Sequence, residues 1–162
     1  MILLITTNPL KAWFQVEGKT MSMHEWYSIM YGIEFPYVKA DGNKVLNFIE
    51  NHKKHFEGED YLPKTVEEAA EYAEEFECDE GAYGLAALIS FVADNKYIYA
   101  EHDDNGNDYI GMFANSLFPW DIPSDDWSNV NREELENEIR SLVEELGIEC
   151  PEFDEHQVWY FG

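Results

Sequence analysis

Carboxylates dominate the side chains of this sequence that can do chemistry. Residues 65–81, TVEEAAEYAEEFECDEG, contain eight acidic residues and no basic one. Hydrolases use two carboxylates whose surroundings set their pKa values apart. Here the carboxylates are so numerous that no such pair stands out. The chemistry that remains is that of charge, which attracts cations and basic proteins.

Histidine and cysteine give weaker signals. The five histidines form no metal-ligand or catalytic spacing, and His52 falls on the apolar side of an expected helix. His102 with Asp103 or Asp104 is the best acid–base pair and keeps a small hydrolase open as an alternative. Cys78 follows an acidic helix, where neighbouring negative charge disfavours the reactive thiolate. The chain lacks GxSxG, P-loop and GxGxxG motifs, so we expect no enzyme and no cofactor.

The segment HDDNGND resembles the start of a calcium loop. Asp103, Asn105 and Asn107 match the first three ligand positions of an EF-hand. The template then requires Gly and Glu where this chain has Asp108 and Ala114. Because Asn-Gly favours the positive φ angles of tight turns, we expect a hairpin turn and no metal site.

The net charge of −24 is concentrated in one part of the chain. Residues 1–56 hold six lysines against five acids, a net of +1, whereas residues 57–162 hold 29 acids against four basic residues, a net of −25. Such charge disfavours direct binding to nucleic acid or to an anionic membrane and favours basic partners. At 45% hydrophobic and 15% aromatic residues, the chain is nevertheless rich enough to fold.

Cysteine usage and the N-terminal residues indicate a compartment. Two cysteines without a CxxC pair are typical of a reducing environment. The start MILLI has no basic segment before it and is too short for a signal peptide or a membrane span. We therefore expect a cytoplasmic protein, in the host cytoplasm if a phage encodes it.

The elements that must position the carboxylates can be predicted from spacing. Residues 2–5 and 13–16 have strand composition around an Asn-Pro turn. Ser22 and Glu25 have capping-box spacing, which predicts a helix closing at Gly32. Asp41 is a plausible cap for a helix with Val45, Ile49, His52 and Phe56 at helical spacing.

Six further elements follow in the acidic part. Thr65 and Glu68 form a second capping box, and the apolar stripe behind it consists of Val66, Ala69, Ala70, Ala73 and Phe76. Residues 82–95 predict a buried helix, residues 96–114 a hairpin, and residues 117–127 a loop. Residues 131–146 predict the last helix, ending at Gly147, and VWYF predicts a closing strand.

This order of elements predicts an α+β fold with mixed helices, a small antiparallel sheet and acidic surface helices. A length of 162 residues suits a single compact domain. The charge asymmetry also allows a subdivision into a neutral N-terminal unit, residues 1–56, and an acidic unit, residues 57–162.

The carboxylates on these elements form the candidate partner-binding surface. Glu67, Glu71 and Glu75 repeat one sign at i,i+4, where soluble helices more often alternate Glu with Lys. The last helix repeats this acidic face, relieved only by Arg132 and Arg140. The candidate residues are Glu67, Glu68, Glu71, Glu74, Glu75, Asp103, Asp104, Asp108, Asp125, Asp126, Glu133, Glu136 and Glu144. Trp120 and Trp127 are either interface anchors or lids on the core.

The run EEAAEYAEEFECDEGAYG resembles segments of the ArdA-type antirestriction proteins, and AWF near Trp13 and the closing VWYF are further similarities. Those proteins are acidic mimics of duplex DNA. The resemblance implies an inhibitor from a phage or mobile element that works through surface Asp and Glu. Many anti-CRISPR proteins share the acidic composition.

We therefore expect a non-enzymatic DNA mimic that inhibits a basic nucleic-acid-binding protein, such as a restriction or CRISPR nuclease. A homodimer is one option for its assembly. A net of −25 corresponds to the phosphates of roughly a dozen base pairs. An immunity-type protein that sequesters a basic toxin or another basic partner is the first alternative. A null hypothesis also stands, since net charge by itself can serve only solubility.

Overall fold

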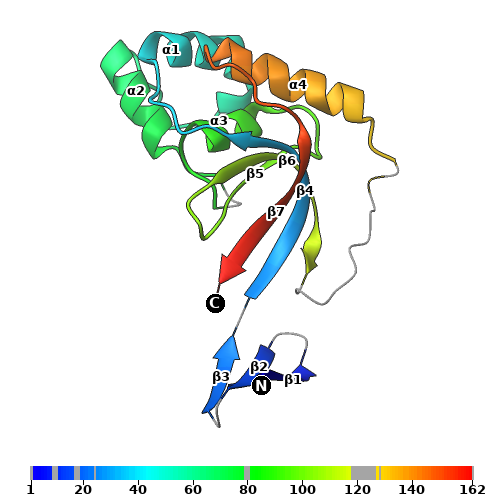
Figure 1. Cartoon of the computed structure of the whole chain (residues 1–162). Helices are drawn as coiled ribbons and strands as arrows, with labels where there is room; N and C mark the ends of the chain where they lie inside the picture. The colour runs from blue at the N-terminus through cyan, green and yellow to red at the C-terminus, as the bar shows by residue number, and fades with distance from the viewer. Residues whose placement is uncertain are drawn as a thin grey trace.

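A computed structural model of the chain describes residues 2–8, 11–16, 19–23, 25–78, 81–117, 127 and 129–161. The described residues form two antiparallel sheets and four α-helices (Figure 1). The α+β prediction is confirmed.

The first sheet contains three strands from the N-terminus. They are β1 (Ile2–Asn8), β2 (Lys11–Val16) and β3 (Lys19–Met23), paired antiparallel in sequence order. The strands predicted at residues 2–5 and 13–16 are therefore confirmed. This sheet lies beyond the end of β4 in Figure 1, away from the helices.

The second sheet has the order β5-β6-β4-β7, with every neighbour antiparallel. Its strands are β4 (Glu25–Phe35), β5 (Tyr99–His102), β6 (Asp108–Leu117) and β7 (Asp154–Phe161). The predicted hairpin and closing strand are confirmed. Gly32 of β4 and Gly111 of β6 are paired in the antiparallel ladder. A Cβ on Gly32 would lie 2.1 Å from the Ile110 carbonyl oxygen. Only glycine permits this close approach.

The helix predicted from Ser22 to Gly32 is wrong. Ser22 belongs to β3, and the residues from Glu25 onward form β4. Strands β6 and β7 pair with the two edges of β4, while apolar side chains cover both of its faces. Met30 and Ile33 point to opposite faces, and both are fully buried. A strand covered on both faces is apolar throughout and lacks the alternation that distinguishes a strand from a buried helix.

The helices are α1 (Gly42–Asn51), α2 (Val66–Glu75), α3 (Gly84–Val92) and α4 (Arg132–Glu145), and a short 3₁₀ helix, η1 (Lys53–Phe56), follows α1. All four helices were predicted, at similar bounds. The predicted caps Asp41 and Thr65 accept hydrogen bonds from their helices, and Gly147 follows α4 with a φ of +77°. Local capping residues thus fix the helix starts.

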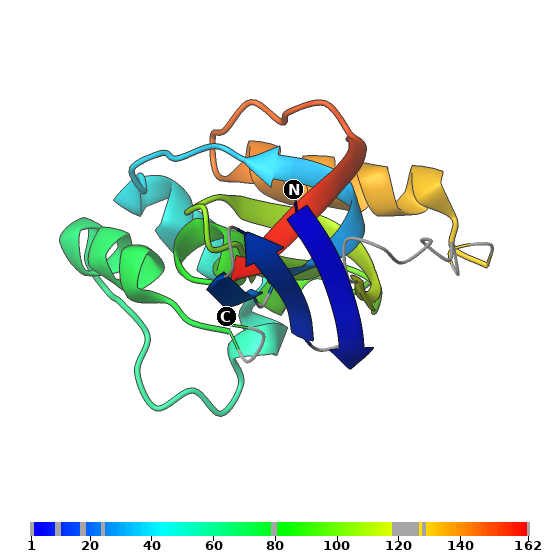
Figure 2. The ribbon, with the colours of Figure 1, turned by 60° about the horizontal axis from the view of Figure 1, so that its bottom comes forward.

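One main core joins the helices to the second sheet. It contains Ile33 of β4, Phe48 of α1, Leu88 of α3, Ile110 of β6 and Ile139 of α4, all fully buried. Figure 2 shows the helices gathered around the sheet. This core includes residues on both sides of position 57, where the charge asymmetry suggests a subdivision.

Candidate partner-binding surface

Helix α2 presents the most regular group of carboxylates. Its apolar stripe is buried through Ala69 and Ala73, so the opposite face points to solvent. Glu67, Glu71, Glu74 and Glu75 are all exposed. None of these four carboxylate side chains has a hydrogen bond or an ion pair with any residue that the structure describes. We call them the α2 ladder, and they can bind basic groups without first breaking an internal contact.

Glu68 differs from the ladder because it caps the helix. Its Oε2 accepts hydrogen bonds from the backbone N–H groups of Lys64 (2.8 Å) and Thr65 (3.2 Å), and the Thr65 hydroxyl accepts from Glu68 N–H (3.2 Å). The predicted capping box is confirmed. Glu68 therefore holds the scaffold of the ladder in place.

Helix α4 divides its carboxylates between the surface and the interior contacts. Glu133, Glu134 and Glu144 are exposed. Glu136, predicted to face a partner, instead accepts a hydrogen bond from the Tyr31 hydroxyl. This hydrogen bond is the main cause that raises the pKa of Tyr31. Glu136 therefore fixes α4 to the sheet.

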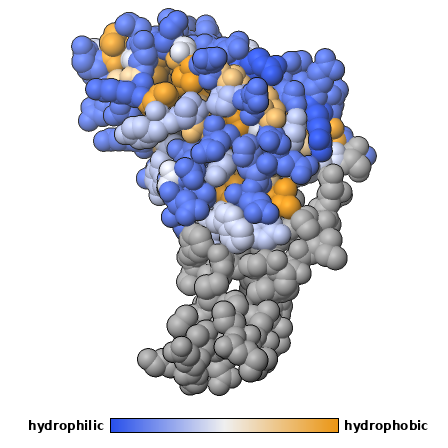
Figure 3. Space-filling model, viewed as in Figure 1, coloured by the Kyte–Doolittle hydropathy of each residue, from blue (hydrophilic) through white to orange (hydrophobic). Residues whose placement is uncertain are grey.

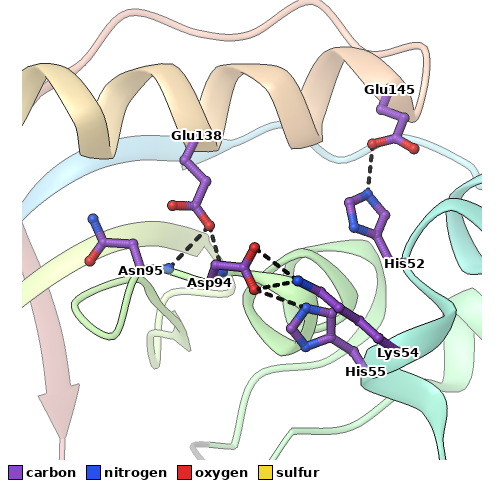
Figure 4. A network of polar contacts seen from close by, with 7 residues as sticks. All are labelled: His52, Lys54, His55, Asp94, Asn95, Glu138 and Glu145. Atoms are coloured by element: carbon purple, nitrogen blue, oxygen red, sulfur yellow. Dashed lines mark hydrogen bonds and ion pairs between the residues drawn. The ribbon is translucent and has the colours of Figure 1, made fainter.

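Two more carboxylates of α4 bind residues that directly follow α1 and α3 (Figure 4). Glu138 Oε1 accepts from the backbone N–H groups of Asp94 (2.5 Å) and Asn95 (3.1 Å). Glu145 pairs with His52 Nε2 at 2.8 Å. His52, expected on an apolar helix face, is thus a half-buried residue satisfied by a carboxylate.

The side chain of Asp94 continues this network. It lies 3.2 Å from Lys54 Nζ and 3.2 Å from His55 Nε2 (Figure 4). The hydrogen bond from Lys54 is the main cause that lowers the pKa of Asp94. Several acidic residues of this chain therefore act as structural links between α1, η1, α3 and α4.

Asp103 is not part of a surface. It is 1% exposed, and its Oδ1 accepts from the N–H groups of Asn105 (3.0 Å) and Asn107 (2.8 Å). The Tyr109 hydroxyl lies 3.4 Å from its Oδ2. Gly106 has a φ of +88°, so the segment is the predicted hairpin turn. The prediction of Asp103 as a partner-binding residue is corrected, because the turn uses its carboxylate.

The acid–base pair also differs from expectation. His102 Nδ1 lies 2.8 Å from Asp108 Oδ1, and the partner is neither Asp103 nor Asp104. The side chain of Asp108 is 29% exposed and its Oδ1 already contacts His102, so this oxygen is less available to a partner than predicted. Asp104 is exposed.

Three predicted residues of the loop at 117–127 lie outside the described part: Trp120, Asp125 and Asp126. Trp127 is described and is 8% exposed within the main core. Arg132 lies 5.9 Å from its ring. Of the two roles offered for Trp127, the structure supports that of a lid on the core.

The two acidic helices do not form one continuous surface. In Figures 1 and 2, α2 and α4 lie on opposite sides of the helical layer with α1 between them. Lys44 of α1 lies beside Gly147 at the end of α4, and Lys54 binds Asp94. Hydrophilic residues nonetheless cover most of the described face in Figure 3. Among the predicted carboxylates that the structure describes, the α2 ladder is therefore the one-signed surface that remains.

Sequence reasoning missed a groove of about 490 Å³ beside α2. Its wall includes the exposed rings of Tyr37 and Tyr83, together with Val38 and the ladder residue Glu74. Tyr37 follows Pro36 in a segment between a strand and a helix. A tyrosine in such a short connection was the available signal, but its spatial proximity to α2 depends on the fold.

No group of three potential metal ligands comes together among the described residues. Within the same residues, no helix has the length and apolar character needed to cross a bilayer. None of the family models, curated proteins and solved structures compared with this chain matches it. The resemblance to the ArdA-type proteins stays a prediction.

Proposed function

We propose that this protein is a non-enzymatic inhibitor that occupies the basic nucleic-acid groove of a DNA-binding defence protein, such as a restriction or CRISPR nuclease. The observation that carries the proposal is the α2 ladder: four exposed and unpaired carboxylates on a helix held by a capping box and by buried alanines.

Spacing and rigidity support this role. Residues four apart on a helix are separated by about 6 Å along its axis, and phosphates on one DNA strand by about 3.4 Å of axis. A ladder of this kind places negative charge at regular intervals, near every second phosphate of a strand. Because the helix is anchored before binding, little conformational entropy is lost when a partner binds.

The arrangement also has a cost that solubility alone does not require. Like charges at i,i+4 destabilise a helix by about 0.2–0.5 kcal/mol per pair, and Glu67, Glu71 and Glu75 form two such pairs. A mixed pattern of Glu and Lys would keep the protein soluble without this repulsion.

The test begins with a pull-down from a bacterial lysate, elution by a salt step and mass spectrometry. The captured nuclease is then assayed for DNA cleavage with and without the protein. We expect inhibition to weaken steeply with salt, to be relieved by excess duplex DNA, and to be abolished by the triple variant Glu67→Lys, Glu71→Lys, Glu75→Lys.

A matched control separates the ladder from bulk charge. The triple variant Glu133→Lys, Glu134→Lys, Glu144→Lys changes the net charge equally on exposed positions of α4. It should retain most of the inhibition. The proposal would be refuted if inhibition did not depend on salt and was unchanged in the triple variant of α2.

An immunity-type protein that sequesters a basic toxin is the second candidate. The separation of α2 from α4 favours it, because α2 alone has 10 residues and extends about 15 Å, the rise of only about four base pairs. Competition separates the two candidates. A partner released by duplex DNA supports the mimic, whereas a partner indifferent to DNA supports sequestration.

A further inference from the structure

The groove beside α2 combines exposed aromatic rings with unpaired negative charge. We call it the Tyr37–Tyr83 groove, lined by Tyr37, Val38, Tyr83, Glu74 and Asp108. Tyr37 is fully exposed, at 104% of its reference area, and Tyr83 is 52% exposed. Aromatic rings that remain this exposed are typical of contact sites for other molecules.

Acidic side chains surround these rings. Glu74 belongs both to the groove and to the α2 ladder, so the two features are continuous. Tyr37 also borders a second hollow of about 470 Å³, which is lined by Glu34, Asp108 and Glu152. Among the described residues, Lys39 is the one basic residue that lines the first groove. The charge of this region favours a cationic occupant.

The chain itself shows how it binds a guanidinium. Arg132 lies 4.5 Å from the centre of the Tyr31 ring, and the Tyr31 hydroxyl in turn donates to Glu136. Arg140 lies 5.3 Å from the Phe153 ring. These are the only two arginines of the sequence, so both stack on rings elsewhere.

We propose that the Tyr37–Tyr83 groove receives an arginine side chain of the basic partner, with the guanidinium stacked on a tyrosine ring and bonded to Glu74. The inference rests on the proposed function, since it names the chemistry by which that partner is anchored. Arginine fits better than lysine because its planar group is less strongly hydrated, stacks on rings and binds a carboxylate through two N–H groups. An apolar segment would instead desolvate Glu74 without pairing it.

The test uses two fluorescein-labelled ten-residue peptides, one alternating arginine and glycine and the other lysine and glycine. Binding is measured by fluorescence anisotropy in 50 mM NaCl. We expect the protein to bind the arginine peptide about five- to tenfold more tightly than the lysine peptide, in the range of cation–π contacts. Tyr37→Ala, alone and with Tyr83→Ala, should bring the ratio of the two affinities, arginine peptide to lysine peptide, close to one.

Two control variants isolate the ring. Tyr37→Phe keeps the aromatic face and should keep the preference, and Tyr61→Ala removes another exposed tyrosine outside the groove and should also keep it. A ratio near one in the unaltered protein would overturn the inference. So would a ratio that survives the loss of Tyr37 and Tyr83.

The α2 reversal distinguishes this inference from the proposed function. Glu67→Lys, Glu71→Lys, Glu75→Lys should weaken both peptides by a similar factor and leave their ratio intact, because those residues do not line the groove. If the triple variant leaves both affinities unchanged, the proposed binding role of the α2 ladder is refuted. The ratio of the two affinities still tests the inference about the groove.

Discussion

Asp103 and Glu74 carry the same functional group in opposite surroundings. Asp103 is buried and accepts two backbone hydrogen bonds of 3.0 and 2.8 Å, while Glu74 is exposed without an internal partner among the described residues. A buried acceptor that loses its donors lowers the unfolding free energy by about 1–3 kcal/mol, so the role of Asp103 is to stabilise the fold. Glu74 remains available for recognition.

Tyr109 allows the buried turn to be tested by pH. Burial, followed by the charge of Asp103, raises the pKa of Tyr109 from 10.0 to about 12. The folded state therefore favours the neutral phenol, so its stabilisation is complete below pH 10 and is lost as the pH rises towards 12. Between pH 9 and 11.5, we expect the protein to lose about 2 kcal/mol more unfolding free energy than Tyr109→Phe does. Urea unfolding at each pH measures this.

Other tyrosines contribute to the same pH range, which makes the comparison between variants essential. The pKa values of Tyr31 and Tyr72 are also raised, and both remain in the Tyr109→Phe protein. Tyr61→Phe, which removes an exposed hydroxyl, should follow the unaltered protein. Equal losses in Tyr109→Phe and the unaltered protein would contradict the assignment.

At the scale of elements, α2 separates the requirements of folding from those of recognition. Glu71 lies four residues from both Glu67 and Glu75. Glu71→Lys replaces two repulsive pairs by two attractive ones, so we expect the unfolding free energy to rise by roughly 0.8–2 kcal/mol. Urea unfolding measures this gain, and the same variant should bind the basic partner less well.

Glu144→Lys on α4 is the matched control for local spacing. It changes the net charge equally but sets a lysine four residues from Arg140. Its stability should therefore rise less than that of Glu71→Lys. Equal gains in the two variants would mean that net charge, and not the i,i+4 geometry of α2, governs stability.

The elements also show where sequence patterns were sufficient. The caps at Asp41 and Thr65 are local, so α1 and α2 were predicted together with the exposed face of α2. The strand β4 was mistaken for a helix, because its partners β6 and β7 begin more than 70 residues further along the chain. Local propensity is overridden when such long-range pairing takes both edges of a strand and distant apolar side chains cover its faces.

The candidate site followed the same rule. Exposure of Glu71 depends on the apolar stripe of its own helix and was predictable. The inward contacts of Glu136 and Glu138 depend on Tyr31 and on the residues after α3, which lie far away in sequence. The Tyr37–Tyr83 groove joins residues of four separate segments, so it could be found only from the fold.

At the scale of the whole molecule, the nearly neutral N-terminal residues and the acidic remainder are not separate in the core. Strand β4 pairs with β6 and β7, and α1 packs against α2. The acidic residues of these described elements therefore lie on one packed unit, formed by the second sheet and the four helices. Repulsion within such a unit lowers its stability.

Salt should consequently act in opposite directions on folding and on binding. The Debye length falls from about 30 Å at 10 mM to about 10 Å at 100 mM salt, which screens repulsion between exposed carboxylates. We expect the melting temperature to rise by about 3–6 °C when NaCl increases from 10 to 300 mM, a gain of about 1.5 kcal/mol. Calorimetry measures this, and tetramethylammonium chloride should give the same rise if screening is the cause. A melting temperature that falls with salt would contradict this prediction. In that case, the loss of partner binding at high salt would no longer separate screened recognition from unfolding.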